Sequence, residues 1–166
     1  MSLADELLGE AYPLNSPRIE AENQAALRRS ISTSYYAVFH LLIDAASEMF
    51  IEGPGREQLR AAVRRTFGHD RMASACKAFL SGRHKLSKFL SASPPPELTK
   101  LSNVFVQLQE ARHRADYDTS ARFTQKDAQS CFYSALDAFS FWRAIRDSED
   151  ARVFLVALLL WKDLRD

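Results

Sequence analysis

The sequence contains little that would interrupt a helix. Its 166 residues include 5 glycines and 6 prolines, the residues that most often end regular structure. Valine, isoleucine and threonine together number 16, against 43 leucines and alanines. Branched residues favour strands, whereas alanine and straight-chain residues favour helices. We therefore predict an all-α fold, and the length suits one domain with one core.

Long apolar runs are also absent. The longest is Val153–Trp161, nine residues, whereas a membrane-spanning helix needs about 20. The first residues, 1–8, lack the basic and apolar regions of a signal peptide. We expect a protein that crosses no membrane and is cytoplasmic.

Motifs for metals and common catalytic chemistry are missing too. Cys76 and Cys131 show no CxxC spacing and lie in apolar helical segments, so we predict buried thiols. Glu110 and His113 form a Glu-x-x-His motif, which di-iron bundles need twice. The second copy is absent, and so are a nucleophile elbow, a P-loop and a dinucleotide fingerprint. We expect no metal site and no cofactor.

Proline, glycine and N-cap residues divide the chain into segments. Ser16 and Pro17 predict the start of a long helix that ends before Gly53, and Thr124 predicts another start. Helices are expected over 3–11, 17–52, 56–66, 69–90 with a break at Gly82, 98–115, from 125 and from 148. We predict a single-domain antiparallel bundle of five to six helices over 1–147, with an extra apolar helix over 148–166.

Two of these helices carry unusual apolar patterns. Behind Thr124, one stripe consists of Ala128, Cys131, Phe132, Ala135, Phe139 and Trp142. The last helix is apolar on two faces, with Phe154, Leu158 and Trp161 on one and Leu155 and Leu159 on the other. Both faces should be buried, on the bundle or on a partner chain.

A polar and aromatic line follows one face of the long helix. Its members recur at spacings of three, four and four: Arg29, Ser32, Tyr36 and His40. Such groups need partners when buried, and Asp116 with Tyr117 are the natural ones. One interpretation is a structural ion pair between Arg29 and Asp116. The other is a functional surface on which Arg112 faces solvent or substrate.

Two segments have a distinctive sequence: Ser32-x-x-Tyr-Tyr-Ala-x-Phe-His40 behind two arginines, and Arg112-x-x-Ala-Asp-Tyr117. Together they resemble the HEPN domain family, in particular its small stand-alone members. The resemblance extends over about residues 7–146 and implies a helical bundle. It also implies a homodimer, and for many members a nucleotidyltransferase-type protein partner.

Many members of that family are metal-independent ribonucleases whose site, built across a dimer, is Arg-x4-6-His. The arginine stabilises the phosphate charge and the histidine transfers the proton. Counting from Arg112, the positions for this histidine hold Tyr117, Asp118 and Thr119. A tyrosine with a pKa near 10 is a poor base at neutral pH. His113 is adjacent to Arg112, so it would need a different geometry.

The charge of +1 conceals an uneven distribution. Residues 56–88 hold nine basic and two acidic residues, a net +7, so the remainder carries −6. Arg56, Arg60 and Arg64 share one helix face by their spacing of four, and Arg71 continues the basic region. A solvated surface or a contact with phosphates or an acidic partner would explain it.

Two functions remain open from the sequence. The first is a nucleotide- or RNA-binding or regulatory module of a toxin–antitoxin or nucleotidyltransferase-linked system. Its binding residues would come from Arg29, Tyr36, His40, Asp116, Arg64 and Arg71. The second is a toxin-like metal-independent ribonuclease that uses Arg112 with Tyr117 or His113. The first is favoured because the histidine is absent from its usual place.

Overall fold

The computed structural model describes residues 17–82 and 88–164, and over these residues it is helical without strands. The helices are α2 (Pro17–Phe50), α3 (Glu57–Arg64), α4 (His69–Ser81), α5 (Pro96–Tyr117), α6 (Gln125–Ile145) and α7 (Glu149–Leu164). The prediction of an all-α fold is confirmed. The helix expected over 3–11 and the basic residues Arg83 and Lys85 lie outside the described residues.

Local signals explain where most helices begin and end. Thr124 and Asp127 form a reciprocal capping box at the start of α6: each backbone N–H donates to the other's side chain, at 2.8 and 3.2 Å. The break expected at Gly82 is confirmed, because Gly82 takes a left-handed φ of 63° and ends α4 after Ser81. The helix expected over 56–66 is shorter, since α3 spans only Glu57–Arg64.

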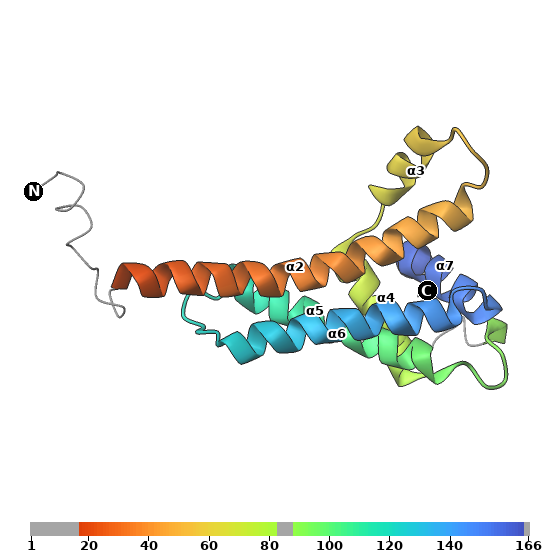
Figure 1. Cartoon of the computed structure of the whole chain (residues 1–166). Coiled ribbons are helices and arrows are strands. Elements are labelled where there is room, and N and C mark those ends of the chain that lie inside the picture. The colour runs from red at the N-terminus through yellow and green to blue at the C-terminus, as the bar shows by residue number, and fades with distance from the viewer. Residues whose placement is uncertain (1–16, 83–87, 165–166) are drawn as a thin grey trace, which may run out of the picture.

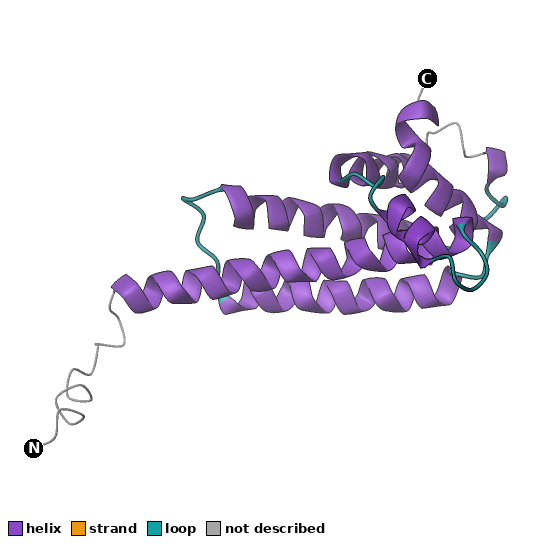
Figure 2. Cartoon of the chain, turned by 90° about the horizontal axis from the view of Figure 1, so that it is seen from above, coloured by secondary structure: helices purple, strands orange, loops and turns teal. Residues whose placement is uncertain are grey.

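The three long helices α2, α5 and α6 lie side by side (Figure 2). Arg28 near the start of α2 contacts Ala115 near the end of α5, so these two helices are antiparallel. The turn after α5 reverses the chain again, and Gln24 of α2 bonds to Phe123 just before α6. Consequently α2 and α6 run parallel, and the bundle is antiparallel only between α5 and its two long neighbours.

The shorter helices gather around the C-terminal half of α2, with α3 projecting from the bundle (Figure 1). Phe79 of α4 meets Phe154 of α7 edge to face, with ring centroids 5.1 Å apart. One hydrophobic core contains side chains from α2, α4, α5, α6 and α7. Both apolar faces of α7 turn inward, since Phe154, Leu155 and Leu158 are buried.

Two details of the predicted core are corrected. Cys76 is buried as expected, and burial raises the pKa of its thiol, but Cys131 is only partly buried. The apolar stripe of α6 also divides: Ala128, Ala135 and Trp142 are buried, whereas Phe132 and Phe139 are exposed. Across the described ranges, no helix combines the length with the hydropathy that a membrane span requires.

Phe105 tests the core at its centre, because its side chain is fully buried and packs on the Tyr35 ring at 5.5 Å. We expect Phe105→Ala to lower the free energy of unfolding by about 3–5 kcal/mol, through lost burial and the cavity left behind. Urea denaturation measures the change. Leu59→Ala is the control, since Leu59 on α3 is half exposed, and its effect should stay within about 0.5 kcal/mol. Equal losses in both variants would contradict this placement of the core.

Candidate functional site

The two distinctive sequence segments lie against each other, one on α2 and the other at the end of α5. Arg28 donates hydrogen bonds to three carbonyl oxygens: those of Ala115 at 2.7 Å, Asp118 at 2.9 Å and Ala121 at 2.6 Å. Carbonyls at a helix C-terminus lack partners within the helix, and a cation satisfies them well. Arg28 therefore fixes the end of α5 and the following turn on α2.

One turn further along α2, a chain of polar contacts connects the same two helices. Ser32 donates to one carboxylate oxygen of Asp116 at 2.5 Å, and the other oxygen lies 2.6 Å from Nε of Arg112. Arg112 in turn donates from Nη2 to the Tyr36 hydroxyl at 3.0 Å. We call these four residues the Arg112 cluster.

The ion pair expected between Arg29 and Asp116 is wrong. The carboxylate of Asp116 is already engaged by Arg112 and Ser32. Arg29 is exposed and lines a hollow between α2 and α6 instead. Helical spacing placed Arg29 on the same side of α2 as Ser32 and Tyr36. That side is wide enough for Arg29 to face α6 while Ser32 and Tyr36 contact α5.

Arg112 is held inside the cluster rather than presented to solvent. Its side chain is only 13% exposed, and its guanidinium lies 5.5 Å from the Tyr36 ring centre and 5.3 Å from that of Tyr117. Burial alone would lower the pKa of Arg112, but Tyr36 and Asp116 outweigh burial and raise it. The group thus stays charged and serves as a link between α2 and α5. The expectation that Arg112 faces solvent is not met.

The other two candidate catalytic residues lie further out. His113 and Tyr117 are both exposed, and their rings stack at 4.8 Å. Tyr117 covers Arg112 with its ring. These contacts bring Arg112, Tyr117 and His113 together, as residues in one patch, although the arginine is already bound to Asp116 and Tyr36.

His69 adds a titratable group that the sequence analysis did not assign to a site. It is the first residue of α4, and its Nδ1 lies 2.7 Å from the hydroxyl of the fully buried Tyr35. Burial raises the pKa of Tyr35, so the hydroxyl keeps its proton and can donate it to Nδ1. That assignment places the imidazole proton on Nε2. No local pattern could have revealed a pairing across 34 residues.

Aromatic packing fixes the His69 ring in place. It stacks on Phe39 at 4.3 Å and meets Tyr36 edge to face at 5.8 Å. Loss of water, and then the positive charge of Arg112, lower the pKa of His69 below its ordinary value of 6.5. His69 is therefore neutral at pH 7, with the Tyr36 ring between it and Arg112.

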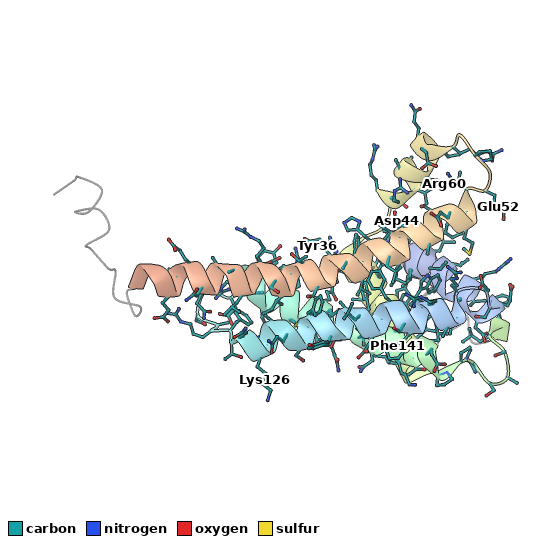
Figure 3. All side chains as sticks on the ribbon, in the orientation of Figure 1. Tyr36, Asp44, Glu52, Arg60, Lys126 and Phe141 are labelled. Atoms are coloured by element: carbon teal, nitrogen blue, oxygen red, sulfur yellow. The ribbon has the colours of Figure 1, made fainter. Side chains whose placement is uncertain are left out.

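Next to this packing, a hollow opens where α2, α3 and the start of α4 meet. Its ionisable lining residues are His40, Asp44, Glu48, Arg64, Arg65 and His69. The floor is apolar, because Phe39, Ile43 and Phe67 are buried there. Asp44 lies at the end of the bundle where α2 meets α3, whereas Lys126 marks the opposite end (Figure 3).

Several arginines of the predicted basic face have structural partners. Arg60 donates to the carbonyls of Ile51 and Gly53 and closes the α2–α3 loop. Arg71 donates to the Leu159 carbonyl at 3.1 Å and ties α4 to α7, so its predicted role in ligand binding is not favoured.

Two arginines remain at the hollow itself. Arg64 pairs with Asp44 at 3.3 Å and stays 30% exposed. Arg65 is exposed and has no ion-pair partner among the described residues. In the part of the chain that the structure describes, no group of three or more His, Cys, Asp or Glu side chains is placed to hold a metal ion.

Arg112 tests the link between the two segments. Arg112→Gln removes the charge that Asp116 faces and the donor that Tyr36 accepts, so we expect the free energy of unfolding to fall by about 1–3 kcal/mol. Arg122→Gln is the matched control, because Arg122 is 71% exposed and, within the described ranges, pairs only with Glu20 at the surface; its loss should stay below about 1 kcal/mol. If both variants unfold alike in urea, the cluster does not hold α2 to α5.

His69 predicts a pH dependence of stability. Because its folded-state pKa lies below 6.5, the unfolded chain binds the proton first when the pH falls. The stabilisation that His69 contributes is complete above its ordinary pKa of 6.5. It is lost as the pH drops through the lower folded-state pKa. We therefore expect wild type to lose more free energy of unfolding between pH 7.5 and 5.5 than His69→Gln does. Urea titrations at both pH values measure the difference, and equal losses would contradict the assigned environment.

A scan of family models finds no match to the chain, and searches of curated proteins and of solved structures find none either. The resemblance to HEPN proteins thus rests on the two sequence segments.

Proposed function

We propose that the protein is a HEPN-like module that binds a nucleotide unit, free or within RNA, and acts in regulation. The observation that carries the proposal is the hollow at the α2–α3–α4 junction, where two histidines and two arginines converge. Guanidinium groups bind phosphate through paired hydrogen bonds. Imidazoles can donate to the same oxygens.

The charges around the hollow favour a ligand of limited size. Asp44 and Glu48 line it together with Arg64 and Arg65. A long nucleic-acid backbone prefers a surface of uniformly positive charge. A single nucleotide instead presents a phosphate that the arginines can bind. It also has hydroxyl and amino groups that can donate hydrogen bonds to the carboxylates.

The packing of the two distinctive segments supports a HEPN-like bundle. Arg28, Ser32 and Tyr36 each bond to the second segment or its adjacent turn, so the residues behind the resemblance form one interface. Under this proposal the protein is cytoplasmic, forms a homodimer and works with a nucleotidyltransferase-type partner, in a toxin–antitoxin or similar two-protein system.

The ribonuclease alternative has weaker geometric support. Arg112 already neutralises Asp116, and its guanidinium lies beside the rings of Tyr36 and Tyr117. A phosphate would have to compete with that carboxylate. Tyr117 and His113 are exposed, and their rings contact each other at a tilt of 54°.

Arg65 provides the test of binding, because it lines the hollow, is exposed and has no ion-pair partner among the described residues. We expect Arg65→Glu to weaken binding of ATP or of a labelled oligoribonucleotide by about tenfold or more, through loss of one phosphate contact. Isothermal titration and fluorescence polarisation measure the two ligands. Lys126→Glu is the control, since Lys126 is exposed at the far end of the bundle.

Three results would overturn the proposal. The first is that wild type binds neither ligand, and the second is that Arg65→Glu and Lys126→Glu lose affinity equally. The third is that wild type cleaves RNA without added metal and Arg112→Ala abolishes the cleavage, which would favour the ribonuclease.

A further inference from the structure

Helix α6 exposes four large apolar side chains within two turns. Phe132, Tyr133, Leu136 and Phe139 are 52%, 63%, 48% and 37% exposed. Single exposed apolar residues are ordinary, but a contiguous group usually marks an interaction surface.

A furrow runs along α2 beside these side chains. Apart from Arg29, the side chains of α2 that line it are small, and they include Ala26, Ser30, Thr33 and Ala37, spaced by four, three and four. Across the furrow stand Phe132, Leu136 and Phe139, spaced by four and three. Alternating spacings of three and four keep each set on one side of its helix, where the side chains of one helix can pack between those of another.

Opposite charges continue the same face towards the C-terminal ends of both helices. A second hollow there is lined by Asp44 and Glu48 from α2 and by Arg143 and Arg146 from α6. Asp44 pairs with Arg64 and Arg146 with Asp147. Glu48 and Arg143 have no ion-pair partners among the described residues, although both are exposed.

We propose that this α2–α6 face is covered by a second copy of the chain. A two-fold axis parallel to the helices lays α6 of each copy over α2 of the other. Because α2 and α6 run parallel, the aromatic ridge of one copy then meets the furrow of the other at the same height. The same operation brings Arg143 and Arg146 of one copy over Glu48 and Asp44 of the other.

Self-complementarity is the reason for choosing a second copy over a different protein. The ridge, the furrow, the basic end and the acidic end all lie on one face of one chain. A two-fold contact needs both halves of each complementary pair on each subunit. A different partner would need only one of them.

This inference rests on the homodimer of the proposed function and assigns its interface, but it does not depend on nucleotide binding. The two surfaces meet, because His40, Asp44 and Glu48 line both the hollow on this face and the hollow at the α2–α3–α4 junction. A second copy packed over α2 would thus border the nucleotide hollow. Dimer formation can nevertheless be measured without any ligand.

Light scattering after gel filtration tests the assembly. For a chain of 18.8 kDa we expect twice that mass, and the monomer mass for Leu136→Lys. Leu59→Lys is the matched control: it places the same charge on a half-exposed leucine of α3, away from this face. That variant should remain dimeric, and circular dichroism should show unchanged helicity and melting for both.

Charge reversal tests the orientation. Glu48→Arg and Arg143→Glu should each raise the dimer dissociation constant by about tenfold, and the double variant should recover most of the affinity. A wild type that stays monomeric at about 100 μM, a range in which specific dimers are populated, would overturn this proposal together with the homodimer of the proposed function. A Leu136→Lys variant that remains dimeric would overturn the α2–α6 interface alone. Failure of the double variant to recover would overturn the parallel arrangement.

Discussion

The guanidinium of Arg112 sets the register between α2 and α5. It donates a hydrogen bond to Tyr36 of α2 and pairs with Asp116 on its own helix. Asp116 in turn accepts a hydrogen bond from Ser32 of α2. A charge that is largely removed from water is tolerated only where such partners are present. Sliding one helix by a turn would leave the Arg112–Asp116 pair intact but break both contacts with α2, those of Ser32 and Tyr36, so the cluster favours one alignment.

The neighbouring residues Tyr35 and Tyr36 extend this constraint to α4. Consecutive residues of a helix point about 100° apart, so Tyr36 meets Arg112 while Tyr35 turns into the core and bonds to His69. Three helices are therefore positioned by one dipeptide. These contacts also fix part of the lining of the hollow at the α2–α3–α4 junction, because His69 and Phe39 line it.

The sequence predicted best what local chemistry controls. Pro17 and Thr124 mark helix starts, and Gly82 marks an end, because capping and left-handed backbone depend on neighbouring residues alone. The partners of Arg29 and Asp116 were missed. Periodicity places a residue on a helix face, but the neighbour that the face meets depends on how all the helices pack.

The same limit applies to exposure and to the site. Phe132 and Phe139 fit an apolar stripe by spacing, yet the part of α2 they flank consists of small residues and leaves them uncovered. His69 entered no predicted site, since its role comes from Tyr35, far away in the chain. Arg71 was expected to bind a ligand because its charge was visible in the sequence, whereas its carbonyl partner on α7 was not.

The hydrogen bonds from Arg28 to the end of α5 and the following turn bear on the order of folding. Its three carbonyl partners lie 87 to 93 residues away in the chain, and closing so long a loop is entropically expensive until much of the intervening chain is ordered. Contacts between α4 and α5, such as the hydrogen bond from Gln109 to Asp70 across 39 residues, close a shorter loop and can form earlier. We therefore expect the contacts of Arg28 with this turn to form late in folding, after α5 has packed on α4.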